Sequence, residues 1–70
     1  MGEEANIQSW ISDNWNAGKS DYENTEALLT KLQRWEERER GTGSETYALI
    51  GKLFERVQVM RELALTEKAV

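Results

Sequence analysis

The residue types that most often carry catalysis are missing from this chain. Its 70 residues include no histidine and no cysteine, so a Ser-His-Asp or Cys-His arrangement would lack its base or its thiol. The sequence also has no glycine-rich phosphate loop, because Gly41 and Gly43 are neither followed by a lysine nor preceded by a strand pattern. We therefore predict that the protein is not an enzyme and has no catalytic residue and no cofactor site.

Acidic residues offer two places in which to look for a metal site. The segment from Asp13 to Asn24 has Gly18 at the sixth position of a calcium loop, but its third and fifth positions are a tryptophan and an alanine, and its twelfth is not glutamate. The second place is the run of residues 36–40, where three glutamates are interleaved with arginines. Charge runs of this kind are typical of a solvated helix end. We predict no metal ligand in either segment.

The charge of the chain is negative and unevenly distributed. The formal net charge of −4 at pH 7 argues against a nucleic-acid backbone as a direct partner, because phosphate binding needs a surplus of lysine and arginine. Residues 1–24 carry all of this net charge, whereas residues 25–70 are neutral overall. These acids could form a docking face. The favoured interpretation is that most of them lie in first helical turns, where carboxylates complement the helix dipole.

Apolar residues recur at helical spacing along most of the chain and predict an all-α fold. The expected helices cover approximately residues 3–16, 21–40 and 45–67. Their connections are short, so we expect one domain over residues 1–70, built as a three-helix bundle or as a helical hairpin plus a short N-terminal helix.

Local sequence signals set the ends of these helices. Ser20 and Glu23 have the spacing of a capping box, in which each side chain bonds a free backbone amide at the start of the second helix. Gly18 and Gly41 are expected to end the first and second helices in the left-handed conformation. Either Thr42 or Ser44 could cap the third helix.

The third expected helix carries most of the large apolar side chains. A seam recurs along it every three or four residues, at Thr46, Ile50, Leu53, Val57, Met60 and Ala64. Further apolar residues widen this seam to about half of the circumference: Tyr47, Leu49, Phe54, Leu63 and Leu65. The first helix is too short to cover this surface, and a 70-residue core without disulfide or metal is marginal. We therefore predict a homodimer built mainly on the third helix.

The expected interface residues lie on this helix and at the end of the first one. They are Trp15, Arg56, Val59, Met60, Leu63 and Leu65. Arg56 and Arg61 flank the apolar arc, and either could reach a glutamate of the other chain or cover the arc with its aliphatic stem. Trp10 and Trp35 share the spacing of isoleucines and leucines, and we expect both in the core.

Residues 26–65 contain a loose family pattern. Leucines precede Trp35-Glu-Glu-Arg38, a glycine turn follows at Gly41, and a threonine-led helix with spaced leucines begins near Thr46. This pattern resembles the C-terminal half of death domains, whereas the N-terminal half of that family has no match in this chain. The resemblance implies an adaptor that assembles with domains of its own kind.

The surplus apolar surface and the missing catalytic groups favour a small protein-protein interaction module or regulator. We expect a helical homodimer that binds another protein, with no membrane partner, since no stretch of the sequence approaches the length of an apolar span. A cytoplasmic location is the default expectation without a secretory signal pattern. The alternative is an acidic inhibitor or nucleic-acid mimic that blocks a basic groove of a DNA- or RNA-handling enzyme. Steep salt dependence of partner binding would favour this mimic.

Overall fold

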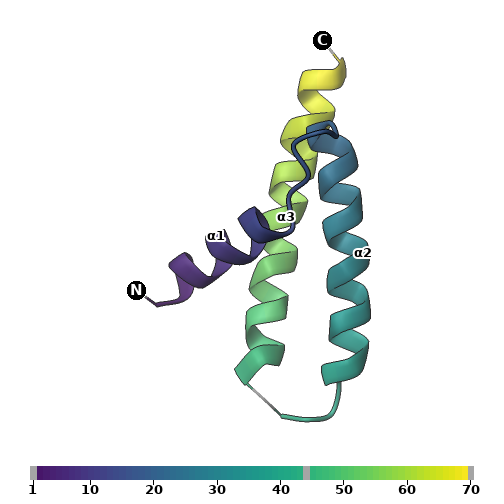
Figure 1. Ribbon diagram of the computed structural model, residues 1–70. Helices are drawn as coiled ribbons and strands as arrows, with labels where there is room; N and C mark the ends of the chain where they lie inside the picture. Colours follow the sequence, from purple (N-terminus) through teal and green to yellow (C-terminus); the bar gives the residue numbers. More distant parts are fainter. Residues whose placement is uncertain (1, 44, 70) are drawn as a thin grey trace.

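Three helices make up the chain (Figure 1). The computed structural model describes residues 2–43 and 45–69, with side chains described through residue 67. The helices are α1 (Glu3–Asp13), α2 (Asp21–Glu39) and α3 (Glu45–Ala69). All regular structure in these described ranges is helical, so the predicted all-α class is confirmed. Over the same residues, none of the helices combines the length and the apolar character that a membrane crossing needs.

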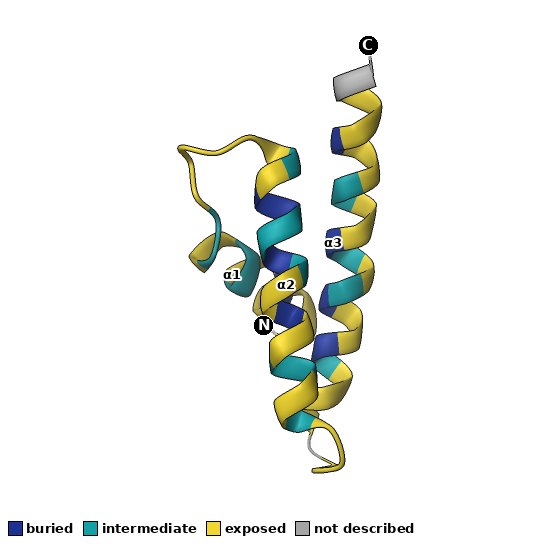
Figure 2. Ribbon diagram, turned by 90° about the vertical axis from the view of Figure 1, so that its right-hand side faces the viewer, coloured by how far each residue is buried: buried dark blue, intermediate teal, exposed yellow. Residues whose placement is uncertain are grey.

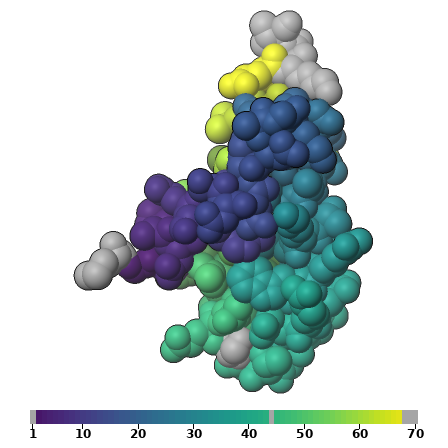
Figure 3. All heavy atoms as spheres, in the orientation of Figure 1, coloured from purple at the N-terminus to yellow at the C-terminus, as the bar shows by residue number. Residues whose placement is uncertain are grey.

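α2 and α3 lie side by side and antiparallel, and the short α1 lies across this hairpin (Figures 1 and 2). The structure thus has the second of the two predicted arrangements. With 11 residues, α1 is less than half as long as α3 with 25, so it covers only part of the hairpin. The space-filling view shows α1 over the middle of the molecule, while α3 extends beyond it (Figure 3).

The core is a seam between α2 and α3, to which α1 adds a single buried side chain. Apolar residues with at most 1% exposure come from both helices of the hairpin: Leu28, Leu32, Ile50, Leu53 and Val57. Figure 2 shows these buried positions on the facing sides of the two ribbons. Ile7 is the contribution of α1. The predicted seam of α3 is correct, since Ala64 is also buried and Thr46 and Met60 are half-buried.

The predicted ends of α2 are confirmed. The Ser20 Oγ accepts a hydrogen bond from the Glu23 amide at 3.2 Å, and the Ser20 amide donates to Glu23 Oε1 at 3.2 Å. Gly41, just after the helix, has a φ of 84°, a left-handed conformation that glycine adopts without a Cβ clash. The proposed cap at Ser44 lies outside the described residues, and Thr42 Oγ1 donates to the carbonyl of Glu39 at 2.7 Å.

α1 ends three residues earlier than predicted, and Gly18 does not end it. The helix stops at Asp13, and the Asn14 side chain donates from Nδ2 to the carbonyl of Trp10 at 2.8 Å. Gly18 is not among the glycines with positive φ; its amide instead donates to Asn16 Oδ1 at 2.9 Å. Asparagine side chains that bond nearby backbone groups compete with helix continuation. The side chains of Asn14 and Asn16, and not a glycine, therefore set the path of the backbone where α1 ends.

A buried asparagine of α2 holds the connection between α1 and α2 in place. Asn24 is only 2% exposed. Its Oδ1 accepts from the Asn16 amide at 2.8 Å, and its Nδ2 faces the Asn16, Lys19 and Ser20 carbonyls at 2.9, 3.3 and 3.1 Å. Because both ends of the amide are satisfied, the burial of this polar group is compensated. The Asn24 side chain thus fixes the loop that places α1 on the hairpin.

We predict that Asn24→Ala lowers the free energy of unfolding by about 1–3 kcal/mol, because the loop backbone loses its buried partner. Thermal unfolding followed by circular dichroism should show a fall of roughly 4–8 °C per kcal/mol for a domain of this size. Gln33→Ala is the matched control, because Gln33 is exposed on the same helix and surface substitutions usually change stability by no more than about 0.5 kcal/mol. Equal melting temperatures for the two variants would contradict the role of Asn24.

Candidate functional site

Two ion pairs fasten α1 to α3. Lys52 Nζ pairs with Glu3 Oε1. One turn further along α3, Arg56 binds the neighbouring Glu4 with both branches of its guanidinium, Nη1 to Oε1 at 2.8 Å and Nη2 to Oε2 at 2.8 Å. Exposed ion pairs contribute little to stability individually, but the two-point arginine contact has a defined geometry. The pairs therefore orient α1 more than they stabilise the fold.

An open groove lies between α1 and α3 beside these ion pairs. It has a volume of about 450 Å³, and its apolar lining comes from Ile11, Trp15 and Met60, with Arg56 among the polar residues. The apolar surface continues along α3 to Val59 and Leu63, which are 54% and 61% exposed. Leu63 lies one helical turn beyond both Val59 and Met60 and thus on the same side of the helix. We call these five residues, Ile11, Trp15, Val59, Met60 and Leu63, the α1–α3 apolar face.

Five of the six predicted interface residues come together at this place. Trp15, Arg56 and Met60 line the groove, Val59 lies with Arg56 in the adjoining hollow, and Leu63 extends the surface. The sixth is separate. At about 100° per residue, Leu65 points some 200° away from Leu63 around the helix, and it is 43% exposed on the other flank of α3. A single flat partner surface therefore cannot cover both leucines.

The arginines that were expected to reach another chain have partners within their own. Arg56 binds Glu4, as described above. Arg61 Nη2 lies 2.5 Å from Glu26 Oε1 and donates to the Tyr22 hydroxyl at 3.2 Å, and its guanidinium carbon is 5.4 Å from the Tyr22 ring centroid. The hydrogen bond to Tyr22 is the main reason why the pKa of Arg61 is raised. Arg61 thus ties α3 to the first turns of α2.

A second surface, on the α1–α2 side, was not predicted from the sequence. Trp10 and Trp35 stack there, with ring centroids 6.1 Å apart and an interplanar angle of 20°. They line an open depression together with Asn14 and three cations of α2, Lys31, Arg34 and Arg38. The signal was present in the spacing of positions 31, 34, 35 and 38, which places the cations and one indole on the same helix face. Both tryptophans were expected in the core, and they are half-buried at its edge.

No cluster of three acidic, histidine or cysteine side chains that could hold a metal ion occurs among the residues that the structure describes.

A comparison of this chain with protein-family models, curated proteins and solved structures found no match. The resemblance of residues 26–65 to death domains therefore stays a prediction. Of the two candidate sites, the α1–α3 apolar face has the more exposed apolar side chains, those of Val59 and Leu63.

We predict that the contact between Glu4 and Arg56 is lost in acid. The hydrogen bond from Arg56 lowers the pKa of the Glu4 carboxyl below its ordinary value, with the charge of Arg56 and a hydrogen bond from Gln8 adding to the effect. A carboxyl whose pKa is lowered by folding stabilises the fold above its ordinary pKa, and this contribution disappears as the pH falls through the lowered pKa. Nuclear magnetic resonance titration of the Glu4 side chain checks this directly. Arg56→Gln should raise the pKa of Glu4, and an unchanged titration in that variant would contradict the assignment.

Proposed function

We propose that this chain is a non-enzymatic protein-protein interaction module that forms a homodimer through the α1–α3 apolar face. The observation that supports the proposal is the position of Val59 and Leu63. Both are more than half exposed, and both lie within one helical turn of half-buried Met60, which lines the groove together with Ile11 and Trp15. Contiguous exposed apolar surface of this kind is typical of interaction sites.

The accessible surface area of the whole chain also supports the proposed association. It measures 5050 Å², whereas a compact monomer of 8.1 kDa is expected to expose about 4,500 Å² from the general scaling with mass. The excess is what a short first helix across a long hairpin produces. A two-fold dimer would bury the same patch of both chains at once, and each buried valine or leucine would stabilise it by about 1.5–3 kcal/mol.

The rim of the proposed interface carries uncharged polar residues and an arginine whose charge is paired within its own chain. Gln8 and Ser12 flank the groove on α1, and Arg56 is already paired with Glu4 of the same chain. We therefore propose an association driven by apolar contact, without ion pairs between the chains. Its dissociation constant should change little with ionic strength, because no separated charges meet at the interface.

The alternative of an acidic nucleic-acid mimic has less support. Glu3, Glu4, Glu26 and Glu36 are each bound to a cation of their own chain. A mimic needs carboxylates that are free to meet the basic groove of its target, so these pairs reduce the number available. We favour a regulator or adaptor that presents an apolar face, and we propose that the dimer in turn binds another protein.

The prediction that tests this proposal compares two leucines of α3. Leu63→Glu should raise the dimer dissociation constant at least about 100-fold, because each chain would place a carboxylate in the apolar contact. Leu65→Glu should leave it within about threefold of the wild type, because Leu65 lies on the opposite flank. Sedimentation equilibrium over the micromolar range measures both. The two substitutions are matched in residue type, helix and charge change.

Two outcomes would contradict the proposed interface. A wild-type chain that sediments as a monomer at high micromolar concentration, with melting independent of concentration, would refute the homodimer. A stronger effect of Leu65→Glu would move the interface to the other flank of α3. Lys52→Glu is unsuitable as a control, because Lys52 pairs with Glu3 and its loss disturbs α1.

A further inference from the structure

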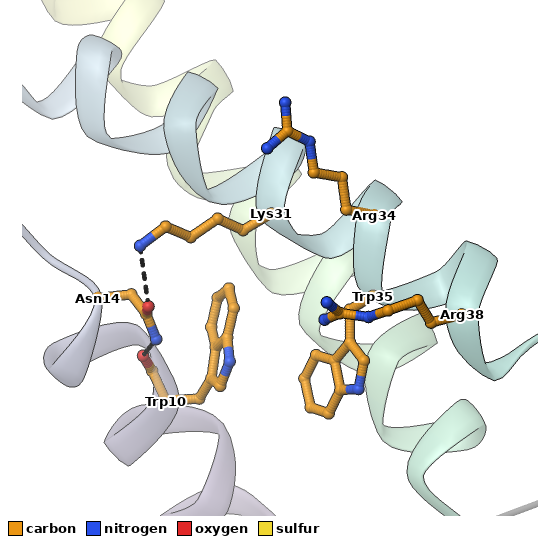
Figure 4. Close-up of a pocket in the computed structure, with 6 residues that line it drawn as sticks. All are labelled: Trp10, Asn14, Lys31, Arg34, Trp35 and Arg38. Atoms are coloured by element: carbon orange, nitrogen blue, oxygen red, sulfur yellow. Dashed lines mark hydrogen bonds between the residues drawn. The ribbon is translucent and has the colours of Figure 1, made fainter.

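The stacked pair of Trp10 and Trp35 stands at the centre of the depression between α1 and α2 (Figure 4). Both indoles pack against the core cluster on one side and remain partly exposed on the other. The core therefore holds two nearly parallel aromatic surfaces at a fixed place on the outside of the molecule. The depression has a volume of about 490 Å³, within the range of sites that bind small organic ligands.

Three cations surround this aromatic pair. Lys31, Arg34 and Arg38 lie three and four residues apart on α2, so that they share one helix face over about 10 Å of its length. Figure 4 shows Lys31 extending toward Asn14 and the Arg38 guanidinium beside the Trp35 indole, whereas Arg34 extends away from the two indoles. Lys31 Nζ donates to Asn14 Oδ1 at 3.0 Å, which holds the lysine at the α1 side of the depression. The arrangement combines flat aromatic surface with positive charge.

These cations differ from most others of the chain in having no acidic partner. Arg40, Lys52, Arg56 and Arg61 each pair with a glutamate of the same chain. Lys31, Arg34 and Arg38, in contrast, form no ion pair with any residue of the described ranges. In a protein of net charge −4, positive charge that is not neutralised thus concentrates beside the tryptophan pair.

We propose that this depression binds a nucleotide, either free or as a unit of a single strand. The base would stack on the exposed surface of the Trp10–Trp35 pair, and its phosphate would lie on Arg38. Aromatic side chains bind bases through their π faces regardless of base type, and a guanidinium can hold a phosphate through two parallel hydrogen bonds. A nucleotide uses both features at once, whereas a carboxylate-rich peptide would use the cations and leave the indoles without a partner.

The overall charge limits the size of this ligand. A net charge of −4 opposes a long duplex, because most of its phosphates would meet the acidic remainder of the chain. Three adjacent cations are sufficient for two or three phosphates. For a single strand, the logarithm of the binding constant should then fall with the logarithm of salt concentration with a slope of about −1 to −2, from roughly 0.7 per phosphate. The site belongs to the α1–α2 side, and none of its lining residues belongs to the α1–α3 apolar face.

Titration followed by the three indole N–H resonances tests the proposal in the intact chain. The probes are adenosine 5′-monophosphate and an eight-residue oligothymidylate. We expect the resonances of Trp10 and Trp35 to shift with either probe and that of Trp15, on the α1–α3 apolar face, to stay in place. Equal affinities for the two probes would identify a free nucleotide as the ligand, and a tighter oligonucleotide would identify a single strand.

Charge reversal provides the matched pair of variants. Arg38→Glu should weaken binding of the tighter probe at least tenfold, whereas Lys19→Glu, the same charge change at an exposed loop position, should weaken it less than threefold. Equal losses of affinity in the two variants would show that the effect comes from the net charge alone, and would overturn the proposal. So would equally tight binding of a hexaglutamate peptide, or the absence of indole shifts at millimolar nucleotide.

Discussion

The antiparallel seam between α2 and α3 is the contact on which the rest of the molecule depends. Leu28 and Leu32 on one side and Ile50, Leu53 and Val57 on the other are removed from water almost completely. Burial of each such side chain is worth roughly 1.5–3 kcal/mol, which is far more than any exposed ion pair of this chain can supply. The polar contacts that position α1 add to a hairpin that this apolar seam stabilises.

The periodic part of this structure could be predicted from the sequence, and the reason is physical. Ile50, Leu53 and Val57 recur with the helical period, and only one side of a helix can face its neighbour. The capping box at Ser20 and the glycine at position 41 were also predictable, because each meets a local backbone requirement that does not depend on the rest of the fold.

Features that depend on contacts between distant residues were not predictable in the same way. Asn24 looks like an ordinary polar residue of α2, and its role as the partner of the Asn16 backbone follows only from the path of the loop. The partners of Arg56 and Arg61 likewise lie far away in sequence, on α1 and α2. Leu65 was grouped with Leu63 because both are apolar and near each other in the chain, although two residues of helix separate their directions by about 200°. Composition identifies candidate surfaces, but helix geometry decides which residues share one.

α1 contributes residues to two surfaces of this molecule, the α1–α3 apolar face and the depression between α1 and α2. Ile11 lies on the side of α1 that meets α3, whereas Trp10 lies on the side that stacks with α2. Each surface is therefore complete only while this helix is docked, and only Ile7 anchors it in the buried core. A molecule that binds either surface favours the docked state and, by thermodynamic linkage, raises the affinity at the other. The short helix that leaves α3 partly uncovered would thus also couple occupancy of one of these surfaces to occupancy of the other.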